Sequence, residues 1–225
     1  DLDVARRLLE AGEKSPLEEV TLAAVHEQAG RLETAEQVLA RLAKHLDVTA
    51  QPFVAASAHT VRGHVARGRG DLPAARREFG TAAELLFGIG HVRHAATAQL
   101  NLGVIAKDLG EHHEAVERLR EARTLFVHVG DAVGAARTAA SLGIAALTRH
   151  DAAAARPWLA EAAAALHRLG DTANARLSRV ILARADAELG DVAAARAALD
   201  ELGPPDGERM RLETEHVLRS IAARA

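Results

Sequence analysis

The 225-residue chain contains no cysteine. Disulfide frameworks, thiolate zinc sites and cysteine nucleophiles are therefore excluded together. Aromatic residues make up only 2% of the sequence, and it has six prolines. Small aliphatic side chains cannot fill one large globular core, but they allow helices to approach closely. This composition favours packed helices over β-sandwiches and barrels.

Long apolar runs and an excess of positive charge are also lacking. No apolar run approaches the ~18 residues that a membrane-spanning helix needs, so we expect a soluble, cytoplasmic chain with no membrane partner. The formal net charge is -3, which argues against a protein that coats polyanions. We therefore expect no direct contact with nucleic acid.

The sequence does have a strong internal periodicity. Glycines recur in two series with a step of forty residues, and an alanine recurs five times with the same step. A small residue stands twelve positions before each alanine, and a bulky residue four positions after it. The glycines are Gly30, Gly70, Gly110 and Gly190, with His150 in the missing place, and Gly90, Gly130 and Gly170. The alanines are Ala35, Ala75, Ala115, Ala155 and Ala195. This register indicates a tandem repeat of one structural unit.

Each repeat is predicted to contain two helices joined by tight turns. The segments between the glycines lack internal breakers and place apolar residues three and four positions apart. A glycine can end a helix in the left-handed conformation, and the Asp that often follows can cap the next one. We expect first helices at about 17–29, 51–69, 92–109, 132–149 and 172–189. Second helices are expected at about 32–46, 72–88, 112–128, 152–168 and 192–202.

One helix pair cannot bury its own apolar face, so the pairs are expected to stack into an all-α solenoid with a continuous core. We expect a single domain over residues 1–225, with repeats at about 16–50, 51–90, 91–130, 131–170 and 171–203.

Both ends of the chain look like partial repeats. Residues 1–12 are predicted to form an N-terminal helix, and residues 207–225 a capping helix or the start of a sixth repeat. In that last segment Met210, Val217, Leu218 and Ile221 are expected to share one face. Since residue 1 is Asp, we expect a piece of a longer protein with flanking domains.

The residues that mark the repeat resemble a known family. Leu102, Gly103, Ala106, Gly110, Ala115, Leu119 and Ala122 follow the small and large residues of the tetratricopeptide repeat, and the pattern recurs across about residues 16–202. The forty-residue period and the ending Leu169-Gly170-Asp171 resemble the sensor arrays of bacterial signal-transduction ATPases and transcription regulators. Arrays attached to caspase-like proteases and those of peptide-pheromone receptors are also similar. The resemblance implies a right-handed superhelix of antiparallel helix pairs.

No catalytic motif is present. Gly88-Ile89-Gly90 lacks the third glycine of a dinucleotide loop and a preceding strand, and no serine lies in a nucleophile elbow. His91 and His94 stand three apart, a spacing at which two imidazoles can share a metal, and His112 and His113 are adjacent, but no third ligand stands at metal-site spacing. We expect no enzymatic activity, no cofactor and no metal.

The resemblance places ligands along the first helix of each pair, on a concave face. The polar groove residues that it selects are His64, Arg67, Arg93, His94, Thr97, Asn101, Lys107, Arg137, Ser141 and Arg184. Phe53, Ser57, Thr60 and Val61 are among their neighbours on this face. Acids are scarce there, since Asp108 and Glu188 lie one position beyond, toward the rim. His64 and His94 are expected to be partly charged near neutral pH.

This charge distribution predicts an anionic ligand, such as an acidic or carboxylate-bearing peptide, because arginine can pair a carboxylate through two hydrogen bonds. The alternative is that the arginines only keep an alanine-rich groove soluble.

The sequence therefore predicts a non-enzymatic protein- or peptide-binding module, the sensor or scaffold arm of a larger bacterial cytoplasmic regulator of signal transduction or transcription. Two other hypotheses remain open. One is a regulatory arm of an enzyme, such as a caspase-like protease or a nucleotide-driven switch. The other is a stand-alone receptor for a peptide or a small molecule.

Overall fold

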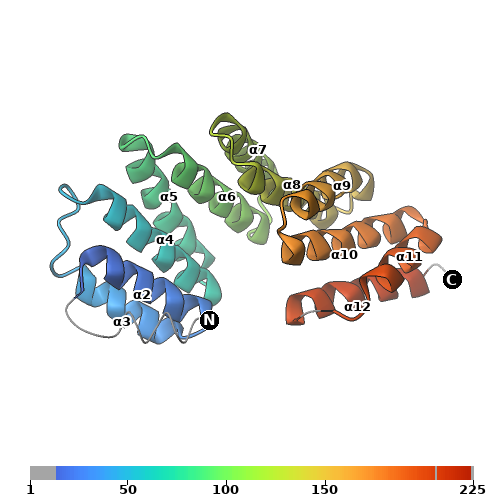
Figure 1. Cartoon of the computed structure of the whole chain (residues 1–225), viewed down its shortest axis with the longest axis horizontal. Coiled ribbons are helices and arrows are strands. Elements are labelled where there is room, and N and C mark those ends of the chain that lie inside the picture. Colours follow the sequence, from blue (N-terminus) through green and yellow to red (C-terminus); the bar gives the residue numbers. More distant parts are fainter. Residues whose placement is uncertain (1–13, 206, 224–225) are drawn as a thin grey trace. The chain divides into compact units, whose positions relative to one another are not determined.

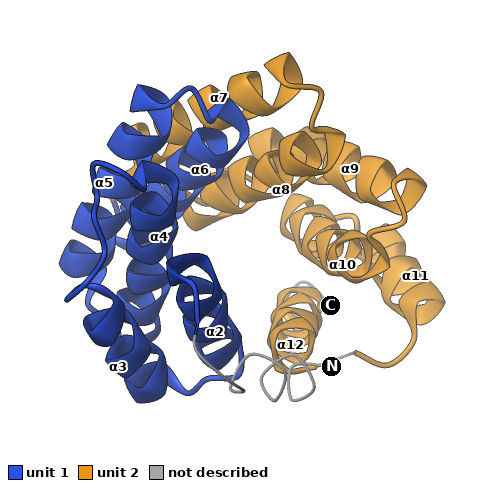
Figure 2. Ribbon diagram, turned by 60° about the vertical axis from the view of Figure 1, so that its left-hand side comes forward, with its two compact units in different colours: residues 1–110 blue, residues 111–225 orange. Residues whose placement is uncertain are grey.

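The computed structural model describes residues 14–205 and 207–223, and every regular element in these ranges is an α-helix (Figure 1). The N-terminal helix expected at residues 1–12 lies outside them. The chain divides into two compact units, residues 1–110 and 111–225 (Figure 2). Each unit has hydrophobic cores of its own.

Unit 1 consists of paired helices whose bounds agree closely with the periodicity. Its helices are α2 (Pro16–Gln28), α3 (Leu32–Leu42), α4 (Pro52–Gly68), α5 (Leu72–Gly88) and α6 (Val92–Asp108). One core cluster joins α2, α3 and α4 around Leu39, and a second joins α4, α5 and α6 around Phe79. Helix α3 ends four residues earlier than expected. In the segment after it, the Asp47 carboxylate accepts hydrogen bonds from the backbone N–H groups of Thr49 and Ala50, which favours a turn.

Unit 2 continues the pattern and ends with an additional helix. Its helices are α7 (His112–His128), α8 (Ala132–Thr148), α9 (Ala152–Arg168), α10 (Thr172–Leu189), α11 (Val192–Leu202) and α12 (Glu208–Ala222). In both units the first helices are α2, α4, α6, α8 and α10, and the second helices are α3, α5, α7, α9 and α11.

The turns between helices confirm the roles expected for glycine and aspartate. Between α4 and α5, Gly70 has φ of 79°, and the Asp71 N–H donates to the Ala66 carbonyl oxygen at 2.9 Å. The Asp71 carboxylate then accepts from the Ala74 N–H at 2.9 Å and caps α5. Asp131, Asp151, Asp171 and Asp191 cap α8, α9, α10 and α11 in the same way.

The small residues of the first helices lie at close contacts with bulky residues of the second helices. A Cβ atom built on Gly63 would lie 2.6 Å from the Phe79 ring, and one on Gly143 would lie 2.5 Å from Leu159. These distances are too short for any side chain at either glycine, so the predicted close approach is confirmed for the pairs α4 with α5 and α8 with α9.

Helix α12 packs mainly on α10 and less on α11. Met210, Val217 and Ile221 are buried in one cluster with Val180 of α10, but Leu218 is 52% exposed. The expectation that Leu218 shares the buried face was wrong. At 100° per residue, Leu218 lies about 80° around the helix from Met210, whereas Val217 and Ile221 lie within about 20°.

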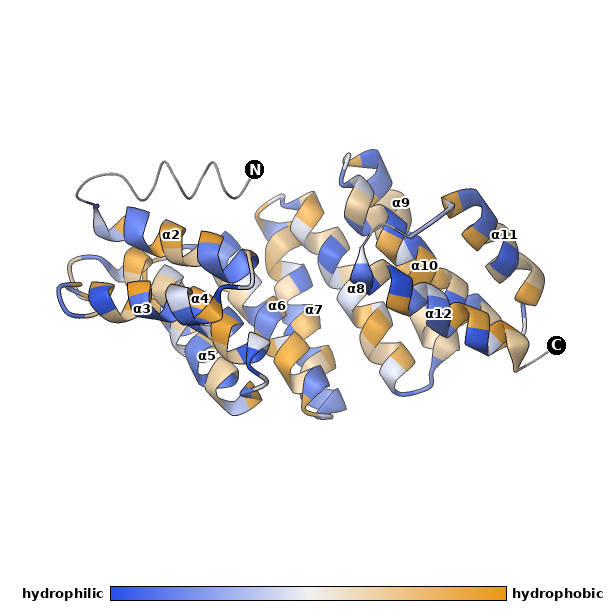
Figure 3. Cartoon of the chain, turned by 90° about the horizontal axis from the view of Figure 1, so that it is seen from below, coloured by the Kyte–Doolittle hydropathy of each residue, from blue (hydrophilic) through white to orange (hydrophobic). Residues whose placement is uncertain are grey.

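Apolar and polar residues are interspersed along the helices, as expected for amphipathic helices that bury one face (Figure 3). Among the residues that the structure describes, none of the helices is long and apolar enough to cross a membrane.

Candidate ligand-binding site

The first helices of unit 1 line an open pocket of about 320 Å³. Its walls come from α2, α4 and α6, with one residue from α5. The lining residues are Leu17, Val20, Thr21, Ala24, Phe53, Ser57, Thr60, Val61, Leu86, His94 and Thr97. We call this the unit 1 pocket.

The pocket brings together only part of the predicted groove. His94 and Thr97 line it, together with four of their predicted neighbours from α4, but sequence reasoning missed the wall formed by α2. The forty-residue step is a signal that could have found this wall. It carries Ser57 and Thr60 back to Leu17 and Val20, which both line the pocket.

Every hydroxyl group in the pocket donates to the backbone of its own helix. Thr21 and Ser57 donate to the carbonyl oxygens of the residues four positions earlier, each at 2.8 Å. Thr60 and Thr97 do the same at 3.0 and 3.3 Å. The hydrogen atoms of these four hydroxyl groups are therefore already used in hydrogen bonds within the helices. The pocket is less polar than its residue types suggest.

Aromatic rings meet at the pocket. The Phe53 ring centroid lies 5.1 Å from that of His94 in an edge-on arrangement, and 4.8 Å from that of His91. Partial burial, followed by the nearby His91 and Arg93, lowers the pKa of His94. The lowered pKa favours the neutral ring near pH 7, so less positive charge is expected on His94 than on an ordinary histidine.

The pKa of His64 is lowered as well, and burial is again the main cause. The His64 ring packs edge-on against Phe79, with the ring centroids 5.0 Å apart. Besides burial, the positive charge of Arg67 lowers the pKa of His64. Sequence reasoning could not anticipate this, because Phe79 belongs to a different helix.

Two of the predicted cations of unit 1, Arg67 and Lys107, lie beside an acid. Arg67 of α4 pairs with Asp108 of α6, with the Arg67 Nη2 to Asp108 Oδ2 distance at 3.1 Å. Lys107 pairs with the same carboxylate. Arg93 lies exposed near the start of α6. The buried Asn101 Nδ2, by contrast, has no hydrogen-bond partner in the described part of the chain.

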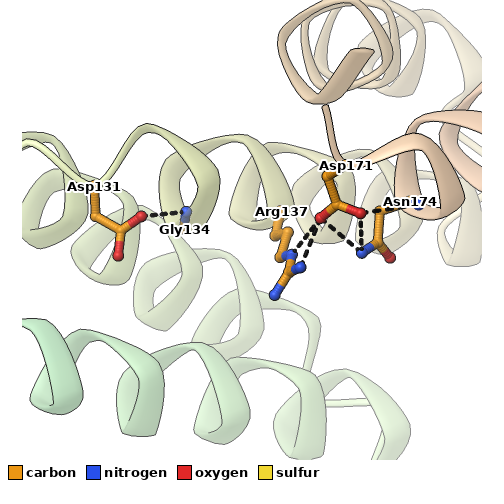
Figure 4. Close-up of polar contacts among 5 residues, drawn as sticks. All are labelled: Asp131, Gly134, Arg137, Asp171 and Asn174. Atoms are coloured by element: carbon orange, nitrogen blue, oxygen red, sulfur yellow. Dashed lines mark hydrogen bonds and ion pairs between the residues drawn. The ribbon is translucent and has the colours of Figure 1, made fainter. Parts of the chain in front are cut away.

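The remaining predicted residues, Arg137, Ser141 and Arg184, belong to unit 2. Arg137 of α8 lies 2.6 Å from the Asp171 carboxylate, which also accepts two hydrogen bonds from Asn174 Nδ2 (Figure 4). The bonds from Asn174 are the first cause, and Arg137 the second, that lower the pKa of Asp171. Ser141 donates to the Arg137 carbonyl oxygen at 3.2 Å.

Arg184 of α10 is paired on two sides. Its guanidinium lies 2.8 Å from Glu188 on the same helix and 3.8 Å from Glu213 of α12. Together with the pairs of Arg67 and Arg137, this gives three ion pairs between consecutive first helices or between α10 and α12. Any anionic ligand has to compete with the acids of these pairs.

Within the ranges that the structure describes, no three His, Asp or Glu side chains lie close enough together to hold a metal ion.

Comparisons with known proteins identify the repeat. One family model described as tetratricopeptide repeat matches residues 94–167, and a second with the same description matches residues 20–41, 56–81 and 177–201. The matched segments together cover more than half of the chain. No curated protein matches the sequence significantly.

Solved structures share the fold at low sequence identity. BtubC from P. vanneervenii is 19% identical with a TM-score of 0.69, covering 92% of this chain and 91% of its own. A Rap protein complexed with competence and sporulation factor is 14% identical with a TM-score of 0.76, covering 97% of this chain and 61% of its own. A signal-transduction ATPase with a tetratricopeptide-repeat sensor, from Pyrococcus horikoshii, is 13% identical with a TM-score of 0.71. That match covers 99% of this chain and 39% of the ATPase.

Proposed function

Because the chain belongs to the tetratricopeptide-repeat family, we propose that it is a non-enzymatic module that binds a protein or peptide in the unit 1 pocket. One observation carries the proposal. Three consecutive first helices of unit 1 leave a pocket with a mainly apolar lining between them. Concave, mostly apolar sites on a rigid scaffold are where proteins usually bind ligands.

We further propose that the module is the sensor or scaffold arm of a larger bacterial cytoplasmic regulator. Two similar structures support this. One is a Rap protein in complex with a factor, and the other is an ATPase whose repeats are named a sensor. This chain spans only 61% and 39% of those two proteins, so such an arm can be part of a longer regulator.

An acidic peptide is a second candidate ligand, for unit 2. Its specific support is Arg137, whose side chain is 52% exposed although it is paired with Asp171. A peptide carboxylate that binds Arg137 takes the place of the Asp171 carboxylate. The affinity of this binding should fall as the salt concentration rises.

A displayed library of random peptides tests the proposed function. The purified chain is immobilised, and the retained peptides are sequenced and then titrated by calorimetry. We expect families of related peptides with measurable affinity, and none on an unrelated helical protein of similar charge. A library that yields no peptide specific to this chain would refute the peptide-binding proposal. Arg137→Glu should weaken only those peptides that bind through carboxylates.

A further inference from the structure

The unit 1 pocket carries no formal charge when His94 is neutral. None of its eleven lining residues is Asp, Glu, Lys or Arg, and its four hydroxyl groups donate within their own helices. A carboxylate that entered it would lose water and meet neither a cation nor a hydroxyl donor in the lining. Burial of an unpaired charge is strongly unfavourable.

Comparison of repeat positions shows where a charged counterpart of these residues lies, on α8 of unit 2. The forty-residue step carries Ser57 to Thr97 and then to Arg137. The two residues in unit 1 are hydroxyl side chains that line the pocket, and the residue in unit 2 is an exposed arginine. The same place in the repeat is therefore uncharged at Leu17, Ser57, Thr97 and Leu177, and charged at Arg137 of α8.

Unit 2 also shows what covers this face. Val20, Thr60 and Val180 occupy one place in the repeat. Thr60 is half-buried and Val20 is 5% exposed where they line the open pocket, whereas Val180 is fully buried in one cluster with Met210, Val217 and Ile221 of α12. Within this chain, apolar side chains from another segment cover the place that is open in unit 1.

The size of the pocket limits the occupant. At about 320 Å³, it lies at the lower end of the roughly 300–1,000 Å³ of small-molecule sites. That volume suits one large side chain rather than a complete cofactor. Leu17, at the pocket, is 48% exposed and offers apolar surface that a ligand would cover.

Given the binding function proposed above, on which this step rests, we propose that the unit 1 pocket holds one bulky, uncharged apolar side chain of a partner peptide and excludes carboxylates. The side chain that occupies the pocket is apolar, as are Met210, Val217 and Ile221, which are buried in one cluster with Val180. The partner is thus recognised here by shape and apolar surface.

Methyl-detected NMR of the full chain tests the chemistry directly. The probes are N-acetyl-leucinamide, N-acetyl-methioninamide and N-acetyl-phenylalaninamide, with the corresponding aspartate and lysine amides as charged controls. We expect the three apolar amides to shift the methyl resonances of Leu17, Val20 and Val61, with dissociation constants in the low millimolar range usual for fragments. The charged amides should leave these resonances unchanged. Equal or stronger shifts with the aspartate amide, or none with any apolar amide, would overturn the proposal.

Three variants locate the effect. Ser57→Trp places a large ring in the pocket and should abolish the shifts. Ser141→Trp is the matched control, since Ser141 also donates to the carbonyl oxygen four residues earlier but lies in unit 2. Thr97→Arg copies Arg137 and should reverse the preference, so that the aspartate amide binds and the leucine amide does not. An unchanged preference in Thr97→Arg would contradict the proposal.

Two further outcomes separate this proposal from the function on which it rests. If library peptides bind but are acidic, and are blocked by Arg137→Glu rather than by Ser57→Trp, the binding function stands and the apolar anchor is wrong. If the chain dimerises in ultracentrifugation and Ser57→Trp makes it monomeric, the occupant is a second copy of the chain. That result would overturn the assignment to a partner peptide.

Discussion

Unit 1 and unit 2 are built from the same repeat but present different chemistry on their first helices. The small glycines and the bulky residues that they contact are alike, as the pairs Gly63 with Phe79 and Gly143 with Leu159 show. The first helices of unit 1 leave a neutral pocket as well as the Arg67–Asp108 ion pair, whereas on the first helices of unit 2 Arg137 and Arg184 carry ion pairs. This comparison indicates that helix packing constrains the residue type only at repeat positions that lie between helices. The remaining positions on the first helices are free to determine what is bound.

The largest effect is expected where the shared packing is broken in one unit only. Gly63→Leu would place side-chain atoms against Phe79, since even a Cβ there would lie 2.6 Å from the ring. Overpacking of this kind should cost about 3 kcal/mol, measured by chemical denaturation. Because repeats couple mainly to their neighbours, hydrogen exchange should loosen unit 1 first.

Gly80→Leu is the matched control for this variant. A Cβ at Gly80 meets no atom within 4 Å, and replacing a glycine inside a helix gains about 0.5–1 kcal/mol. An equal loss of stability in both variants, or uniform loosening of both units by Gly63→Leu, would contradict the view that packing is local.

A smaller effect is expected from the contacts that distinguish unit 2. Asp171→Ala removes the cap of α10 together with the partner of Arg137. Loss of a cap costs about 0.5–2 kcal/mol, and we expect this variant near the upper limit. Asp151→Ala removes a cap from α9 in the same unit and should cost less. Equal unfolding free energies for the two variants would show that the Arg137 contact contributes no stability.

One turn of unit 2 differs from its counterpart in unit 1. His150 has φ of 58°, at the place in the repeat where unit 1 has Gly70. Side chains are disfavoured in the left-handed region, so His150→Gly should raise the unfolding free energy by about 0.5–1 kcal/mol. Gly70→His should lower it by a similar amount. A thermal melt that shifts in the same direction for both variants would refute this explanation.

The smallest effect concerns pH and is confined to unit 1. Burial holds the pKa of His64 below the value of about 6.5 expected in the unfolded chain. The unfolded chain therefore binds the proton more readily, and this contribution to stability is complete above that value. It is lost as pH falls through the folded pKa. His64→Ile copies Ile144, its counterpart in unit 2, and should flatten the dependence. We expect the urea midpoint to fall less between pH 7.5 and pH 5.5 in this variant than in the original protein. An equal fall in the two proteins would contradict the role given to His64.

Local signals in the sequence predicted the helices well. A glycine followed by Asp marks the end of one helix and the start of the next, as at Gly70 and Asp71, and both roles lie within a few residues. The end of α3 was missed because the chain after Leu42 continues in turns, in which the N–H groups of Lys44 and His45 donate to carbonyl oxygens three residues earlier, although the apolar pattern still looks helical. Leu218 was misplaced because a count of apolar residues ignores their exact angle around the helix.

The candidate site was less predictable, because its properties depend on residues far apart in the sequence. Arg67 pairs with Asp108, and Arg137 with Asp171, across different helices. The protonation of His64 depends on burial against Phe79. The hydroxyl groups of the pocket were visible in the sequence, but not their donation to their own helices.

The Asp171 carboxylate has a consequence that follows from thermodynamic linkage. It caps the first turn of α10 and also neutralises Arg137 (Figure 4). An anion that binds Arg137 breaks the ion pair between Arg137 and Asp171, which is one of the contacts that hold the Asp171 carboxylate in place. Fraying of the first turn of α10 and anion binding at Arg137 therefore favour each other. Because such coupling is reciprocal, a change that loosens the start of α10 raises the affinity of Arg137 for anions by the same factor.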